Sequence, residues 1–306
     1  MRKKDLLTLL EYSPEELRGI LNLAAKHKKE RGTVEKKTLA GKTGVLIFQK
    51  PSLRTRVSFE TAIHELGGHV IYLPDESVGM DTRESVEDIA RNLERIVHLV
   101  VARTYAHGTV TRLAGACGIP VINALTDWCH PCQALAFGLT MLEARPGKRL
   151  NAVFVGDGNN VCNSIMALCA KLGYSFTAAC PKGYEPDASL TEKCKKICEE
   201  TGGETNVTND LHAAVEQADV IYTDVWASMG QEAEAEKRRA AFRGYQVDEA
   251  LIARAPKDVL VSHCLPAKRG EEITGGVLDS ANSVAYEEAE NRLHVQKAVI
   301  TYLFGG

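Results

Sequence analysis

The amino-acid sequence predicts an α/β fold with two domains, each a parallel sheet flanked by helices. Short apolar runs alternate with amphipathic segments along the whole chain, as is typical of buried parallel strands joined by crossover helices. The runs fall into two series. The length of 306 residues also favours two domains, because one domain usually has about 100–200 residues.

Each series of apolar runs predicts the strands of one domain. We expect strands at 45–48, 70–73, 97–102 and 120–122 in the first series, and at 152–155, 176–179, 220–223 and 259–262 in the second. Between the series, 131–144 predicts a helix that ends at a proline and a glycine in 145–148, where we place the domain junction. Apolar residues at helical spacing predict a terminal helix over 286–304.

The charge balance and the cysteines narrow the classes of partner and compartment. The chain has 37 Lys and Arg against 40 Asp and Glu, a formal net charge of −3, so neither nucleic acid nor an anionic membrane is expected as a main partner. Nine cysteines spread over a long chain argue against a disulfide framework and favour the cytoplasm. No apolar run reaches the roughly 18 residues of a membrane span, and the first residues do not form a convincing signal peptide.

The segment after the first strand has the layout of a phosphate site. Residues 49–56 lie between this strand and a helical pattern that runs through Leu66. Ser52 is able to cap this helix, whose N-terminal amides and dipole favour an anion, and Arg54 adds a planar cation. A well-capped surface helix with its arginines in solvent explains the pattern equally well.

Polar residues also follow the third and fourth strands. Arg103 comes at the end of the third strand, and His130 and Gln133 follow the fourth. The proline between them fits the first turn of a helix, which places both side chains where they are able to hydrogen-bond a carbonyl; a lone histidine is more often structural. Cys129 and Cys132 form a C-x-x-C pair, but no second pair at zinc-like spacing accompanies them, so we expect neither a zinc nor a redox site.

The string GDGNN at 156–160 follows the fifth strand. It resembles the first half of a dinucleotide fingerprint but lacks the third glycine. Asn159 and Asn160 stand where the backbone should approach a pyrophosphate, which favours a ligand other than a nicotinamide dinucleotide. A glycine turn with asparagine caps fits equally well.

Asp224 and Cys264 follow the last two predicted strands. The carboxyl ends of parallel strands are where α/β proteins bind their ligands. A carboxylate there is able to hold a substrate cation, and a partly exposed thiol is able to contact a reacting amine. Considered in isolation, Cys264 is more often a buried, inert thiol.

Taken together, these strings resemble one protein family. The order and approximate spacing are those of ornithine carbamoyltransferases for SLRTR (52–56), HPCQ (130–133), GDGNN (156–160), DVWASMG (224–230), HCLP (263–266) and ENRLH (290–294). The similarity runs from about residue 5 to the end of the sequence. Its most specific part is the pair formed by DVWASMG and HCLP, because aspartate carbamoyltransferases share the phosphate motif but not these two.

The resemblance implies a domain arrangement and an assembly. It implies a carbamoyl-phosphate-binding domain at 1–145 and an ornithine-binding domain at 148–285, joined by interdomain helices, with the last helix, 286–306, packing back on the first domain. It also implies a homotrimer or a multiple of trimers. Closure of the two domains would exclude water from the labile carbamoyl donor, and neither a metal nor an organic cofactor would be required.

The resemblance further implies the residues of the site. Carbamoyl phosphate would be held by Ser52, Leu53, Arg54, Thr55, Arg103, His130, Gln133, Arg292 and the backbone near Cys264 and Leu265. Ornithine would be held by Asn160, Asp224, Ser228 and Met229, and the catalytic residues would be Arg103, His130, Asp224 and Cys264.

The implied reaction is attack of the side-chain amine of ornithine on the carbonyl carbon of carbamoyl phosphate, giving citrulline and phosphate. Donors from Thr55, Arg103 and His130 would stabilise the negative charge that develops. Asp224 and the Cys264 sulfur would orient the amine, which has to lose a proton, and the phosphate is a candidate for its acceptor.

Two positions depart from the family pattern. Leu53 stands where the commonest family string has threonine, so a hydroxyl is missing, although the backbone N–H at this position is still able to contact phosphate. Gly79 occupies the place at which many members have a glutamine or histidine that reaches carbamoyl phosphate in the neighbouring subunit. That cross-subunit side chain is therefore missing here.

Three rival functions fit the sequence less well. Another carbamoyl acceptor, such as putrescine or an acylated ornithine, is disfavoured by Asp224 and residues 228–230, because a free α-amino acid needs polar groups at its charged end. A nicotinamide dehydrogenase would need the missing glycine. A non-catalytic phosphate-binding or regulatory protein would bind carbamoyl phosphate but release no citrulline.

Overall fold

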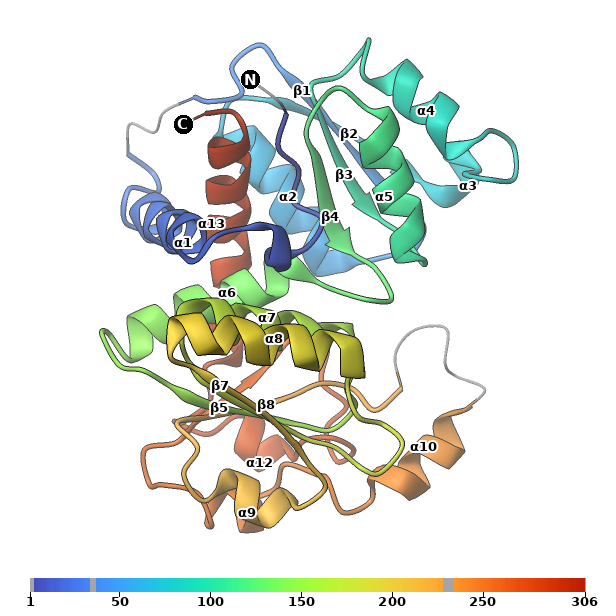
Figure 1. The fold of residues 1–306 in the computed structure, drawn as a ribbon. Coiled ribbons are helices and arrows are strands. Elements are labelled where there is room, and N and C mark those ends of the chain that lie inside the picture. The colour runs from blue at the N-terminus through green and yellow to red at the C-terminus, as the bar shows by residue number, and fades with distance from the viewer. Residues whose placement is uncertain (1–2, 34–36, 228–233, 306) are drawn as a thin grey trace. The chain divides into compact units, whose positions relative to one another are not determined.

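The computed structural model describes residues 3–33, 37–227 and 234–305, and the chain forms two compact units (Figure 1). The first unit comprises Met1–Leu139 and Glu290–Gly306, and the second comprises Thr140–Ala289. Two helices, α6 (Pro131–Ala144) and α13 (Ala285–Leu303), each contain a boundary between the units. The first unit therefore uses two segments that are far apart in the sequence.

The first unit contains a parallel sheet, with the strand order β2-β1-β3-β4 among its described residues. The strands are β1 (Thr43–Phe48), β2 (His69–Pro74), β3 (Leu99–Arg103) and β4 (Val121–Leu125). The central strands β1 and β3 have the apolar sequences TGVLIF and LVVAR and are almost entirely buried, as expected of a parallel sheet covered on both faces. The winding changes direction between β1 and β3, and α/β sheets bind their ligands at the carboxyl ends of strands at such a switch point.

Helices cover both faces of this first sheet (Figure 1). Besides α6 and α13, they are the short 3-10 helix η1 (Leu9–Glu11), α1 (Pro14–Lys29), α2 (Leu53–Glu65), α3 (Asp75–Val78), α4 (Val86–Leu93) and α5 (His107–Ala116). Ile89 of α4 and Leu113 of α5 pack in one core with Ile47 of β1. Alternate residues of a strand point to the other face, where Ile63 of α2 lies against Gly44.

The second unit contains a second parallel sheet, with the order β7-β6-β5-β8-β9 among its described residues. The strands are β5 (Asn151–Val155), β6 (Ser175–Ala179), β7 (Glu204–Thr208), β8 (Val220–Thr223) and β9 (Leu260–His263). Its helices are α7 (Asn160–Leu172), α8 (Ala188–Thr201), α9 (Leu211–Val215), α10 (Ala235–Phe242), α11 (Glu249–Ile252) and α12 (Gly275–Leu278). In Figure 1, α7 and α8 lie on one face and α9 and α12 on the other. The winding reverses between β5 and β8, which makes a second switch point.

The predicted α/β class with two parallel sheets is confirmed, and each predicted strand overlaps an observed one. Among the described residues, β7 is a strand without a predicted counterpart. Its sequence ETNVT is polar and mostly exposed, because it lies at the edge of the second sheet, so it lacks the apolar run that marks a buried strand. No helix in the described ranges is both long enough and apolar enough to cross a lipid bilayer.

Candidate active site

The predicted anion motif forms the turn between β1 and α2, at the first switch point. Ser52 has an extended backbone (φ −158°) and is the N-cap of α2. Its hydroxyl oxygen accepts a hydrogen bond from the backbone N–H of Thr55 at 3.4 Å. The Leu53 side chain is 75% exposed, and Arg54 is half-buried. The start of a helix of 13 residues therefore lies at the carboxyl end of a central strand, where its dipole favours an anion.

Thr55 joins two arginines from distant parts of the first unit. Its buried hydroxyl oxygen accepts hydrogen bonds from Arg292 Nη2 at 2.7 Å and from Arg103 Nη1 at 3.4 Å. Arg103 is the last residue of β3, and Arg292 lies on α13. Both side chains are buried. Two buried guanidinium groups beside one hydroxyl repel each other and lack the solvation that water would give them. A dianion bound between them would neutralise both charges, so the arrangement favours a dianionic ligand.

His130 and Gln133 are buried at the start of α6. The Gln133 N–H donates to the His130 carbonyl at 3.1 Å. Burial, reinforced by the charges of Arg292 and Arg103, holds the pKa of His130 well below its usual value. The imidazole is therefore neutral at pH 7. It offers an N–H donor without adding a third positive charge, which suits the polarisation of a carbonyl.

Asp224 and Cys264 meet at the carboxyl ends of β8 and β9 in the second unit. The Cys264 thiol donates to Asp224 Oδ1 at 2.8 Å. Asp224 is buried and Cys264 is half-buried. The nine cysteines all lie in the described ranges as free thiols, and the other eight are buried. Cys264 is thus the thiol best placed to contact a ligand, beside a carboxylate that is able to hold a cation.

Asn159, named from the sequence as a cap or ligand residue, is also a partner of Asp224, which the sequence did not predict. Its Nδ2 donates to Asp224 Oδ2 at 2.7 Å, while its Oδ1 accepts from the backbone N–H groups of Val161 and Cys162 at 3.0 and 3.1 Å. It therefore caps α7 and orients Asp224 at the same time. Asn160, the predicted ornithine ligand, is the half-buried first residue of α7. The sequence signal for Asn159 was its position directly before an apolar helix, which indicates a cap.

The loop after β9 is held by a buried histidine and a buried glutamate. The Leu265 N–H donates to His263 Nδ1 at 2.8 Å. Because a backbone N–H only donates, Nδ1 carries no proton, and His263 Nε2 donates to Glu272 Oε1 at 3.1 Å. Glu272 Oε1 also accepts from the Lys268 N–H. Leu265 has a φ of 52°, a left-handed conformation that costs a leucine free energy, so these bonds maintain the backbone next to Cys264.

Asp224, His263 and Cys264 bring three potential metal ligands within 4.8 Å of one another. Both nitrogens of His263 and the Cys264 thiol already take part in the hydrogen bonds described above. These three side chains therefore form a hydrogen-bonded group, and a metal ion would have to replace these hydrogen bonds in order to bind.

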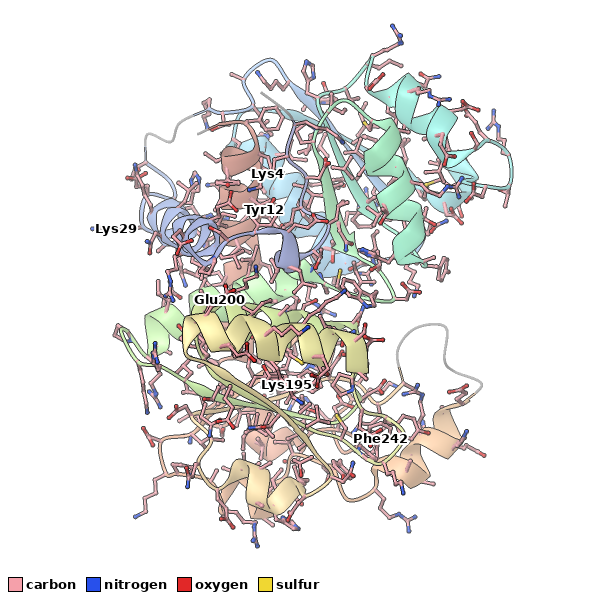
Figure 2. The ribbon with its side chains drawn as sticks, viewed as in Figure 1. Lys4, Tyr12, Lys29, Lys195, Glu200 and Phe242 are labelled. Atoms are coloured by element: carbon pink, nitrogen blue, oxygen red, sulfur yellow. The ribbon has the colours of Figure 1, made fainter. Side chains whose placement is uncertain are left out.

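A buried ion pair lies beside the second switch point. Arg238 Nη1 of α10 donates to Asp157 Oδ2 at 2.8 Å and to the Trp226 carbonyl at 3.0 Å. The Trp226 ring stacks on that of Phe242, with ring centroids 5.8 Å apart; Phe242 is labelled in Figure 2. Burial raises the pKa of Asp157 to about 6. These contacts fix the chain on either side of 228–233, and the predicted ornithine ligands in that stretch, Ser228 and Met229, lie outside the described residues.

Gly79 ends α3 in a left-handed conformation with a φ of 62°. A Cβ at this position would lie 2.9 Å from the Cβ of Arg83, which is closer than van der Waals contact allows. A larger side chain at this position would therefore require the turn or Arg83 to shift.

Comparison with known proteins places both units in one family. Residues 4–143 match the aspartate/ornithine carbamoyltransferase carbamoyl-P binding domain, and residues 148–303 match the Asp/Orn binding domain of the same family. The chain is 49% identical to the ornithine carbamoyltransferase of Pyrococcus horikoshii over 308 aligned positions, covering 100% of this chain and 97% of that one.

Solved structures give the same result. The ornithine carbamoyltransferase of Pyrococcus furiosus has a TM-score of 0.96 at 48% identity, covering 99% of this chain and 98% of that one. The anabolic ornithine carbamoyltransferase of Campylobacter jejuni has a TM-score of 0.93 at 38% identity, covering 98% of each chain.

Proposed function

Because the chain belongs to the aspartate/ornithine carbamoyltransferase family, we propose that it transfers the carbamoyl group of carbamoyl phosphate to the side-chain amine of L-ornithine. The products are L-citrulline and phosphate, and the reaction is a step of arginine biosynthesis. The observation that carries this function is the identity of nearly half the residues with ornithine carbamoyltransferases over the full length of the chain. The choice of ornithine over aspartate is further supported by Asp224 and Cys264. Each is the first residue after its strand, and each belongs to one of the two most specific motifs.

The first unit is the carbamoyl-phosphate-binding domain in this proposal. The start of α2 and the two arginines at Thr55 bind the phosphate. Their support is chemical, since a helix N-terminus and two buried guanidinium groups are both suited to a dianion. Ser52, Leu53 and Arg54 complete this set, with Leu53 contributing its backbone N–H, while Gln133 holds the carbamoyl group together with His130. His130 donates to the carbonyl oxygen.

The second unit is the ornithine-binding domain. Asp224 and the Cys264 sulfur orient the nucleophilic amine, and Asn160, Ser228 and Met229 hold the amino-acid end of ornithine. The backbone at Cys264 and Leu265 contributes to the carbamoyl group. The hydrogen bond between Cys264 and Asp224 supports a shared role for these two side chains.

The chemistry is electrostatic stabilisation together with positioning. Negative charge develops on the carbonyl oxygen and then on the departing phosphate, so the donors of Thr55, Arg103 and His130 lower the barrier. Loss of one such donor typically costs about 10²-fold in rate. The amine has a pKa of ~10.4 in solution, so it has to lose a proton before attack. In this proposal the phosphate group of bound carbamoyl phosphate accepts that proton before attack. It accepts a second proton from the attacking nitrogen as the C–O bond breaks, so it leaves as dihydrogen phosphate.

The proposed assembly is a homotrimer or a multiple of trimers in the cytoplasm. Leu53 and Val57, one turn apart on α2, are 75% and 53% exposed. Large apolar side chains that share an exposed helix face are typical of interaction surfaces. Nine free thiols support a reducing compartment. Sedimentation of the purified chain measures the assembly directly.

A citrulline assay with a panel of acceptors tests the function. The chain is incubated with carbamoyl phosphate and with L-ornithine, N-acetylornithine or putrescine, and citrulline and phosphate are measured together. We expect equimolar citrulline and phosphate with ornithine only. Carbamoylation of N-acetylornithine or putrescine in preference to ornithine would refute the assigned acceptor, and binding of carbamoyl phosphate without product would indicate the regulatory alternative.

A further inference from the structure

We propose that Glu288 is a positioning residue for the transfer reaction, which holds Asp224 against Cys264 through hydrogen bonds from Tyr222 and Ser262. This inference rests on the proposed roles of Asp224 and Cys264. Glu288 acts on these two residues indirectly, through its hydrogen bonds with Tyr222 and Ser262.

The carboxylate of Glu288 joins two neighbouring strands of the second unit. Tyr222 Oη donates to Glu288 Oε1 at 2.7 Å, and Ser262 Oγ donates to Glu288 Oε2 at 2.6 Å. All three side chains are buried. Tyr222 lies on β8 and Ser262 on β9, while Glu288 lies near the start of α13. Each carboxylate oxygen therefore ties one strand, and the two strands are held at a fixed lateral distance.

The strand register places this bridge directly before the functional pair. Tyr222 pairs with Ser262 across β8 and β9, and Thr223 pairs with His263. Asp224 and Cys264 directly follow the two strands, and each comes two residues after a residue bound to Glu288. Because a parallel pair advances in step, any change in spacing at the bridge is passed on to the contact of 2.8 Å between Cys264 and Asp224.

The chemistry of the bridge makes it stiff. Hydrogen bonds from hydroxyl groups to a buried carboxylate are short and strong, and the low local dielectric raises the cost of breaking them. Burial, followed by the charge of Glu288, raises the pKa of Tyr222 well above its usual value. Tyr222 therefore remains a protonated donor at physiological pH.

The end of β9 is held on its other face as well. Neighbouring residues of a strand point to opposite faces, so Ser262 reaches Glu288 on one face and His263 reaches Glu272 on the other. Ser262 and His263, which directly precede Cys264, are thus each bound by a buried carboxylate. A loop end fixed on both faces is the condition for a reactive group that has to be placed to within a fraction of an ångström.

Tyr222→Phe and Ser262→Ala test the proposal, because each removes one donor and leaves Asp224 and Cys264 unchanged. Tyr12→Phe is the matched control (Figure 2). Tyr12 and Tyr222 are both 1% exposed, and the Tyr12 hydroxyl donates to the Asp5 carbonyl at 2.7 Å in the first unit. The readouts are KM and kcat for both substrates and the rate at which iodoacetamide alkylates Cys264.

We expect Tyr222→Phe to lower kcat/KM for ornithine on the order of 10-fold or more, with the KM for carbamoyl phosphate unchanged. Alkylation of Cys264 becomes faster, because its thiol is less firmly bound to Asp224. In the double variant, the second substitution adds less than it does alone, since both donors act through Glu288. Tyr12→Phe changes none of these quantities.

The inference is wrong if Tyr222→Phe and Ser262→Ala match Tyr12→Phe in ornithine kinetics and alkylation rate. Should Tyr222→Phe fail to fold, Ser262→Ala alone decides. Absence of citrulline from the unchanged chain would instead refute the proposed function, and the alkylation rates would still report on the bridge.

Discussion

Replacement of Thr55 by valine tests the donor site most directly. Valine has nearly the same shape as threonine, so Thr55→Val mainly removes the hydroxyl that accepts from Arg292 at 2.7 Å and from Arg103 at 3.4 Å. A hydrogen bond to a charged group contributes about 1.5–3 kcal/mol. The Arg292 bond has good geometry and should contribute within this range, whereas the longer Arg103 bond should contribute less.

If the Thr55 hydroxyl orients the two arginines for the phosphate, the substitution should lower kcat/KM for carbamoyl phosphate. Since every ~1.4 kcal/mol corresponds to tenfold, loss of the Arg292 bond should lower kcat/KM for carbamoyl phosphate by about 10–100-fold. The assay is initial-rate citrulline formation with carbamoyl phosphate varied at saturating ornithine. Thr301→Val is the control, because Thr301 is also buried and its hydroxyl lies 3.2 Å from His27 Nε2. Equal kcat/KM values for the two variants would refute the reasoning.

Three further predictions concern the second unit. Cys264→Ala should lower kcat/KM for ornithine and change its pH profile, and an unchanged profile would remove Cys264 from the chemistry. Burial raises the pKa of Asp157 from 3.8 to about 6 in the folded chain. The stability linked to protonated Asp157 is therefore fully present below the unfolded pKa and is lost as pH rises through the folded pKa. Between these two pH values the chain should lose about 3 kcal/mol of unfolding free energy relative to Asp157→Asn in urea titrations, and parallel stability curves for the two proteins would contradict this. His263→Asn keeps an acceptor near the Leu265 N–H and should retain more activity than His263→Leu, whereas equal activities would show that this acceptor is unimportant.

The sequence alone sufficed for the parts of the fold that local patterns determine. Apolar runs identified the central strands, because burial on both faces requires an unbroken apolar sequence. The helix over 131–144 was predicted with the bounds observed for α6. β7 was missed because an edge strand with the sequence ETNVT buries little apolar surface.

The candidate site was predictable only where a residue lies next to a recognisable strand end. Arg103, Asp224 and Cys264 satisfy this condition, and the structure brings the last two together. Asn159 was missed as a partner of Asp224, which is 65 residues away in the sequence. Glu288 gave no local signal either, since a glutamate on a helix is usually solvated and only the fold buries this one between two strands.

The position of Arg292 on α13 has a consequence for biosynthesis. Two guanidinium groups donate to the Thr55 hydroxyl, from Arg103 and from Arg292. The second of these comes from the segment 290–306, which completes the first unit. During translation the N-terminal segment emerges first and starts to fold while later residues are still unsynthesised. A nascent polypeptide therefore lacks one of the two buried cations at Thr55 until residue 292 has left the ribosomal exit tunnel, and this cluster is incomplete until then.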